Sequence, residues 1–199
     1  MTELTTETKQ AGETERPLRA DARRNRECIL QAAREVFAKY GTDAQIDDVA
    51  SRAGVGVGTV YRHFPTKEAL MAELVRQKFR VFSAGAREAL QRDTEPFAVF
   101  ADMLRRNAEE LARDAGMQQV LVGVGEQIWA QAQTEVDELN TLTAELIARA
   151  QQAGTMRLDV RATDIGMLMC GLCATMTQSR PGFDWHRHLE LGIDTLRAR

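Results

Sequence analysis

The chain contains little of what marks secreted, disulfide-bonded or membrane-spanning proteins. Its 199 residues include only three cysteines and four prolines. A small, odd number of cysteines argues against a disulfide framework and favours a reducing compartment, so we expect a cytoplasmic protein. No apolar run approaches the roughly 18 residues that indicate a membrane span, and we expect no membrane partner. Residues 1–15 are polar and acidic and lack the hydrophobic segment that a secretory signal needs.

Alternating, strand-like patterns are missing as well. Ala, Leu, Glu and Arg predominate between the prolines, and all four are strong helix formers. Apolar residues recur at three- and four-residue spacing, as they do on one face of a helix. The predicted fold class is therefore all-α, with residues 1–15 as a disordered tail. The predicted helices cover about 22–40, 46–53, 57–64, 67–90, 96–114, 117–123, 125–152, 162–179 and 185–197.

The net charge of −3 is unevenly distributed along the chain. Residues 16–80 carry 13 Lys and Arg against 8 Asp and Glu, whereas residues 81–199 carry 12 against 17. A basic segment attached to an acidic remainder favours contact between one end of the molecule and a polyanion.

Three glycines alternate at positions 54, 56 and 58 of the stretch AGVGVGTVYRHF. A dinucleotide-binding loop needs G-x-G-x-x-G after a buried strand, but the residue three after Gly56 is Thr59, and the preceding IDDVASRA has helical periodicity. The Gly-Lys-Ser/Thr of a phosphate-binding P-loop is missing too. The alternative is a helix-turn-helix, in which Gly54 turns one short helix onto the next and Val55 fills the space between them. We predict the helix-turn-helix.

Residues 27–74 resemble the DNA-binding domain of the TetR family of bacterial transcriptional regulators. The resemblance rests on FAKYG, DDVASRAGV and GTVYRHFPTKEAL, and on the mutual spacing of the turn, the Tyr-x-His-Phe and the lysine. It implies a homeodomain-like, three-helix DNA-binding domain over residues 16–75 and a helical effector-binding and dimerisation domain over residues 76–199. It also implies a double-stranded DNA operator, a small-molecule effector and a homodimer joined through the last two helices, with no cofactor, metal or catalytic residue.

The second short helix carries the side chains expected to meet DNA. Val60 and Phe64 lie four residues apart and are predicted to face inward, whereas Gly58 and Arg62 lie two residues to either side of Val60 and face outward. Arg62 suits a guanine edge or a phosphate, and Thr59 suits a base or a thymine methyl group. The resemblance implies that Val57, Gly58 and Thr59 approach bases, while Tyr61, His63 and Lys67 bind the phosphate backbone.

Two further segments are candidates for DNA contact. Gln45 stands where many family members carry a Ser or Thr that caps the helix and contacts phosphate, and it is expected to replace that contact. Arginines at 16, 19, 23, 24 and 26 form a basic run around the start of the first predicted helix. The run is either a solvated helix start or an arm that lies along phosphates or in the minor groove, with Arg23 and Arg24 as contacts.

An effector pocket is expected among the middle helices, although a stripe of aromatic and Met side chains is also typical of simple core. The apolar segment 165–176 predicts a helix that is buried on most sides. Within it, Cys170 and Cys173 form a CxxC, which favours buried packing over a metal or redox role because no second pair accompanies it. His186 and His188 favour a surface or interface role over metal binding. The candidate pocket residues are Phe97, Phe100, Met103, Leu104, Met117, Leu121, Trp129 and Met167.

Three functions follow from these patterns. The first is a ligand-responsive, homodimeric transcriptional repressor, with an activator as its variant. The second is an enzyme that uses the glycine turn or the CxxC, but no nucleophile–base pair or carboxylate dyad with a defined spacing supports it. The third is a helical interaction protein without DNA affinity. The helix-turn-helix and the charge distribution favour the first.

Overall fold

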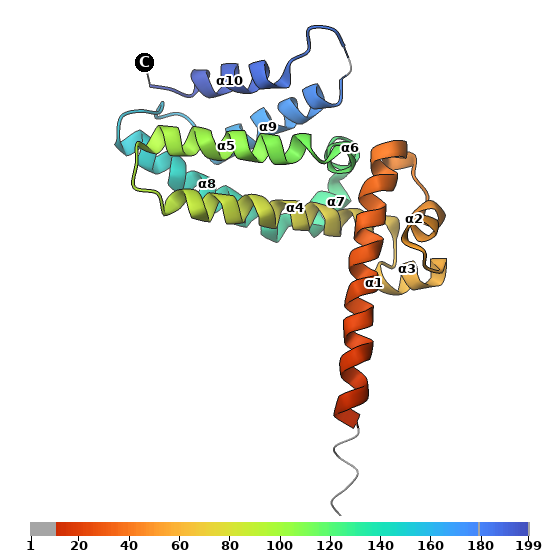
Figure 1. Ribbon diagram of the computed structural model, residues 1–199. Helices are drawn as coiled ribbons and strands as arrows, with labels where there is room; N and C mark the ends of the chain where they lie inside the picture. Colours follow the sequence, from red (N-terminus) through yellow and green to blue (C-terminus); the bar gives the residue numbers. More distant parts are fainter. Residues whose placement is uncertain (1–10, 179, 199) are drawn as a thin grey trace, which may run out of the picture.

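The structure, a computed structural model, describes residues 11–178 and 180–198, with side chains from residue 21 on. The chain is helical almost throughout this part (Figure 1). The described residues form no strand, only a single bridge between Met156 and Arg197. The predicted all-α fold class is confirmed. The elements are α1 (Ala11–Tyr40), η1 (Gly41–Asp43), α2 (Ile46–Ala53), α3 (Val57–His63), α4 (Lys67–Leu90), α5 (Pro96–Ala112), α6 (Ala115–Gly123), α7 (Glu126–Gln131), α8 (Gln133–Gln152), α9 (Ala162–Met176) and α10 (Trp185–Thr195).

Two of the predicted helices differ from the structure by more than the one to three residues seen at the other helix ends. Helix α1 begins at Ala11 instead of near residue 22, so residues 11–15 of the predicted tail are helical, while residues 1–10 lie outside the described residues. This extension contains Gly12 and Pro17, which disfavour helix, as well as Ala, Glu and Arg, which favour it, so residue preference alone does not explain it. The helix predicted over 125–152 is divided at Ala132, whose φ of −106° and ψ of 7° interrupt it. The turn buries Ala132 completely in the core.

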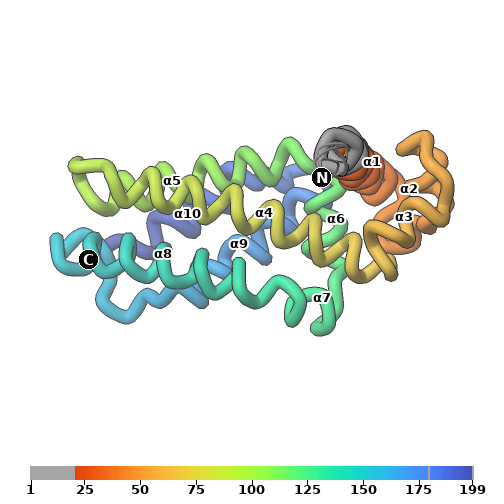
Figure 2. Tube along the Cα trace, turned by 90° about the horizontal axis from the view of Figure 1, so that it is seen from below, coloured from red at the N-terminus to blue at the C-terminus, as the bar shows by residue number. Residues whose placement is uncertain are grey.

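The helices form two parts, which Figures 1 and 2 show from two sides. The head consists of α1, α2, α3 and the beginning of α4. The body consists of the rest of α4 with α5 to α10, whose long helices run roughly alongside one another. Helix α1 runs across the direction of α4 and α5, and Figure 2 shows it end-on. Because α4 begins in the head and ends in the body, it joins the two parts directly.

The head shares its hydrophobic core with the body. Phe37 of α1 and Val60 of α3 belong to the same buried cluster as Leu111 of α5 and Met117 of α6. A second cluster fills the far end of the body, between α5, α8, α9 and α10. The head and α6 therefore share one close-packed core. None of the helices in the described ranges combines the length and the hydropathy needed to cross a bilayer.

Candidate nucleic-acid interface

The turn between α2 and α3 is built on Gly54. Its φ of 68° and ψ of 29° lie in the left-handed region, where a side chain would be strained, so a glycine is needed here. Two backbone hydrogen bonds close the turn: Gly54 N–H donates to the Ser51 carbonyl at 3.2 Å, and Val55 N–H donates to the Ala50 carbonyl at 3.1 Å. Val55 packs against the core of the head. The glycine stretch therefore forms a helix-turn-helix, as predicted from the sequence.

Helix α3 has one inner and one outer face. Val60 is completely buried and Phe64 is 3% exposed, so both face the core. Tyr61 is 47% exposed, and the side chain of Arg62 is exposed as well. A Cβ built on Gly58 meets no atom within 4 Å, so the space next to Gly58 on the outer face of α3 is open. The residues predicted for DNA contact therefore share a free outer face: Val57, Gly58, Tyr61 and Arg62 are exposed, and Thr59 and His63 are half-buried.

The orientation of α3 is fixed from behind by Arg26 of α1. The Arg26 guanidinium lies 5.3 Å from the centre of the Phe64 ring and 2.9 Å from Glu73 Oε1 on α4. Burial disfavours the charged form of Glu73, yet hydrogen bonds from Arg26 and Arg76 outweigh burial and hold the pKa of this carboxyl below its usual range. Arg26, which the sequence places in the basic run, is thus a structural residue that holds three helices together.

The other predicted contacts have partners within the protein. The Lys67 ammonium donates to the Thr42 carbonyl oxygen, and Gln45 Nε2 donates to the Asp43 carbonyl at 2.7 Å. The Gln45 N–H donates to Asp48 Oδ2 at 3.2 Å, which helps cap α2.

Arg23 and Arg24 are exposed on α1 beyond the packed part of the head. Arg24 Nη2 lies 3.7 Å from Asp21 Oδ1. Both side chains of this pair are largely in solvent, where an ion pair contributes little. The two guanidinium groups therefore have little to hold them to the protein.

Two family models match the chain. The model of bacterial regulatory proteins of the tetR family matches residues 29–74, which span the C-terminal part of α1, the helix-turn-helix and the start of α4. The model of the C-terminal domain of SbtR-like transcriptional regulators matches residues 95–198, which make up more than half of the chain. The chain belongs to the TetR family. It is a DNA-binding transcriptional regulator, as predicted, and the hypothesis of an enzyme is wrong.

Known members of the TetR family resemble the chain over most of its length. A TetR transcription regulatory protein from Mycobacterium vanbaalenii is 35% identical, with 92% of this chain and 100% of that chain covered and a TM-score of 0.60. The TetR regulator SCO0520 from Streptomyces coelicolor is 31% identical, with 87% and 98% covered and a TM-score of 0.58. The repressor KstR from Mycobacterium tuberculosis is 27% identical over 178 residues, 87% of this chain and 81% of its own.

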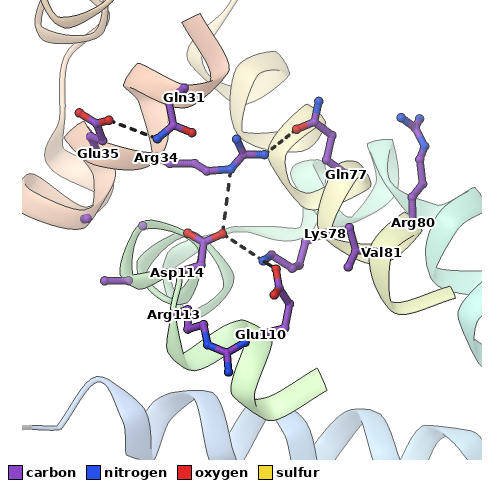
Figure 3. Close-up of a pocket in the computed structure, with 13 residues that line it drawn as sticks. Gln31, Arg34, Glu35, Gln77, Lys78, Arg80, Val81, Glu110, Arg113 and Asp114 are labelled. Atoms are coloured by element: carbon purple, nitrogen blue, oxygen red, sulfur yellow. Dashed lines mark hydrogen bonds and ion pairs between the residues drawn. The ribbon is translucent and has the colours of Figure 1, made fainter. Parts of the chain in front are cut away.

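In this TetR-family chain, a charged cleft of about 760 Å³ lies between α1, α4, the end of α5 and the start of α6 (Figure 3). Arg34 of α1 donates to Gln77 Oε1 on α4 at 2.6 Å and lies 4.0 Å from Asp114 Oδ2. The buried Lys78 ammonium lies 3.1 Å from both Asp114 Oδ2 and Glu110 Oε1. Asp114 also caps α6 by accepting from the Met117 N–H at 2.9 Å. One carboxylate thus ties the head, α4 and the start of α6 together.

Two glycines of α6 lie directly against the head. A Cβ on Gly116 would lie 2.8 Å from the Arg34 carbonyl carbon and closer still to its oxygen, a distance that real Cβ atoms do not show. A Cβ on Gly123 would collide with the Thr42 methyl group. Seven residues separate the two glycines, so they lie on the same face of α6. Sequence reasoning missed both contacts, because neither glycine belongs to a recognisable motif.

A largely apolar cavity of about 610 Å³ lies inside the body, between α4, α5, α8 and α9, with α6 and α7 at one end. Five of the predicted pocket residues line it: Met103, Leu104, Leu121, Trp129 and Met167. Phe97, Phe100 and Met117 do not line it. All three are completely buried in the two hydrophobic clusters, since their positions on α5 and α6 face neighbouring helices.

The cysteines and histidines of the C-terminal part form no metal site, and no group of three His, Cys, Asp or Glu suited to a metal occurs among the described residues. Burial raises the pKa of the Cys173 thiol to about 12, so it stays protonated, and its Sγ lies 3.7 Å from the Gln118 carbonyl oxygen. Cys170 is exposed. His186 Nε2 lies 3.4 Å from Glu109, and His188 Nδ1 lies 2.8 Å from the Thr175 hydroxyl.

Proposed function

We propose that the chain binds a pseudo-palindromic operator in the cytoplasm as a homodimer, represses transcription there and is released by a small-molecule effector. Its DNA-binding domain would comprise residues 16–75, and residues 76–199 would bind the effector and form the dimer. The observation that carries the DNA-binding part is the free outer face of α3. Arg62 on this face makes no hydrogen bond or ion pair with another described residue, so its guanidinium is free to bind DNA.

The proposed contacts divide into base and phosphate contacts. The open space before Gly58 lets the backbone of α3 approach base edges, with Val57 and Thr59 beside it and Arg62 on a guanine or a phosphate. Tyr61, His63, Lys67, Gln45, Arg23 and Arg24 would bind phosphates. The Lys67 ammonium would turn from the Thr42 carbonyl to a phosphate oxygen, or use a second of its three donors.

The proposed dimer is supported by apolar side chains that the single chain leaves in solvent. On α9, whose apolar sequence predicts burial on most sides, Met167 is 66% exposed. On α10, Leu191 is 49% exposed. Exposed apolar surface on adjacent helices favours association of two copies, and two-fold symmetry would set the α3 helices about 34–36 Å apart, one turn of DNA. Met167→Glu should therefore reduce the mass of the particle measured by light scattering, whereas an unchanged dimer would exclude this interface.

The proposed release by an effector is supported by the position of α6. Leu121 of α6 lines the cavity, while Gly116 and Gly123 of the same helix contact the head. A ligand that widens the cavity would displace α6, and the close glycine contacts would pass the displacement to α1 and η1. The ligand then favours a spacing of the two heads that no longer fits successive major grooves, which weakens operator binding.

The proposal is tested with duplex fragments that the protein selects from the host genome. Affinity is measured by fluorescence anisotropy over a range of salt concentrations, because phosphate contacts make binding fall steeply with salt. We expect Tyr61→Phe and Lys67→Ala to weaken binding to all duplexes, and Arg62→Ala to alter sequence preference as well, at about 1–3 kcal/mol. Arg106→Ala, on the exposed side of α5, is the matched control and should bind as the parent does. Equal affinities for all four variants would refute the assignment.

A further inference from the structure

The wall of the body cavity carries no charge. Of the 22 described residues that line it, none is Asp, Glu, Lys, Arg or His. Phe79 and Phe82 of α4 and Trp129 of α7 supply aromatic surface, and Leu, Val, Ile and Met side chains supply most of the rest. The Cys173 thiol does not change this picture, because it stays protonated at neutral pH. An ionised group on the buried side of this wall, against Leu104, Leu111 and Ile165, would lose its hydration and find no opposite charge, which is strongly unfavourable.

Of the four polar side chains on the apolar wall, Thr163 of α9 is exposed, and the other three are buried or half-buried: Asn107 of α5, and Asn140 and Thr143 of α8. Asn140 and Thr143 lie three residues apart and so on the same face of α8. None of the hydrogen bonds between described side chains or backbone groups uses these two carboxamides or this hydroxyl. Polar groups on an otherwise apolar wall fix the orientation of a ligand through one or a few hydrogen bonds. Together they offer both donors and acceptors to a ligand oxygen.

We infer that the effector is an uncharged, largely apolar molecule with one or two carbonyl or hydroxyl oxygens, which the carboxamides of Asn107 and Asn140 and the Thr143 hydroxyl would bind. The inference rests on the proposed function, since it concerns the effector of that same cavity. The volume of about 610 Å³ lies within the range of about 300–1,000 Å³ of pockets that hold drug-sized ligands. Free carboxylates and thioesters of coenzyme A are disfavoured, the first by their charge and the second by their phosphates.

The test compares neutral probes with anionic partners that carry the same or a similar apolar part. Trp129 lies in the cavity wall, whereas the other tryptophan, Trp185, packs in the second core cluster. In full-length protein with Trp185→Phe, Trp129 fluorescence therefore reports occupancy of the cavity without DNA. The probes are dodecanol against dodecanoate and dodecanoyl-coenzyme A, and progesterone against deoxycholate. We expect the neutral probes to bind more than about tenfold more tightly than their anionic partners.

A charge placed in the wall provides a second, independent comparison. Asn140→Lys should reverse the preference, so that the variant binds dodecanoate at least about tenfold more tightly than dodecanol. Thr141→Lys adds the same charge on the exposed side of α8 and should keep the parent preference. The probe pairs on the parent protein decide the question if Asn140→Lys fails to fold.

Binding of an anionic probe within about tenfold of its neutral partner, or no binding by any neutral probe, would overturn the inference. Operator release is measured separately by anisotropy with the same probes. Neutral probes that fill the cavity without weakening operator binding would support the inference about the cavity and refute the proposed release. If an anionic probe changes Trp129 fluorescence and also releases the operator, the proposed release would be supported and the inference about the cavity refuted.

Discussion

Gly116→Ala should separate the head from the body by a small, defined displacement. The added Cβ would lie 2.8 Å from the Arg34 carbonyl carbon and closer to its oxygen, whereas ordinary contact begins at 3.4 Å. The atoms in the way belong to the backbone of α1 and cannot rotate aside as a side chain could. Either α1 or the start of α6 must therefore move, by a distance on the order of an ångström.

The size of the effect follows from the packing. Inserting a methyl group into a close-packed contact costs about 1–3 kcal/mol, which for a chain of this length lowers the melting temperature by roughly 2–12 °C. Operator affinity should fall too, because a displaced head no longer presents both α3 helices in register. Loss of a single base-pair contact costs about 1–3 kcal/mol, so we expect binding to weaken by about fivefold to a hundredfold.

The matched control is Gly125→Ala, also at an end of a helix beside the head. Gly125 has a φ of −82°, and a Cβ there meets no atom within 4 Å, so alanine should be tolerated. Thermal unfolding and anisotropy on the selected operator measure stability and affinity for both variants. A Gly116→Ala protein that melts and binds like Gly125→Ala would show that the α1–α6 contact does not set the position of the head.

Three further predictions concern buried polar groups. Glu73→Gln should destabilise the protein at neutral pH, because Arg26 and Arg76 would lose a charged partner. The pKa of Glu73 is lowered in the folded state. The ionised carboxylate therefore stabilises the fold fully above the ordinary pKa of 4.5, and this stabilisation is lost as the pH falls below that value. The melting temperatures of parent and variant should converge in acid. Ser83→Ala should raise stability by about 1 kcal/mol in urea unfolding, since the buried Ser83 hydroxyl has no partner among the described residues, and a lower stability would contradict this. Iodoacetamide should label Cys28, which is exposed, and not Cys173 in the folded protein, as mass spectrometry would show; rapid labelling of Cys173 would mean that its burial is wrong.

The helix-turn-helix could be predicted because each of its parts has a local cause. Gly54 is needed for a left-handed turn, Val60 and Phe64 are spaced to share a buried face, and Thr66 accepts from the Ala69 N–H at 3.0 Å as a helix cap does. None of these features depends on distant parts of the chain. The inner and outer faces of α3 therefore follow from residue spacing alone.

The body was harder to predict because its features depend on contacts between distant segments. Nothing in the residues around Ala132 marks the turn there, at which Ala132 is completely buried in the core. Phe100 and Met117 have the same chemistry as the residues that line the cavity, and only the rotation of α5 and α6 decides which of them face it. The cluster of Arg34, Lys78 and Asp114 joins residues up to 80 positions apart, so no local pattern could indicate it.

The length of α1 has a mechanical consequence. This single helix holds the contact with Gly116 at Arg34 and also carries Arg23 and Arg24, about 15 Å further along at about 1.5 Å per residue. A rigid rod that pivots at Arg34 swings its free end further than it moves at the pivot. The two arginines would then sweep the widest arc, so a slight tilt could lift them from a duplex before the packing between α1 and α6 has changed much.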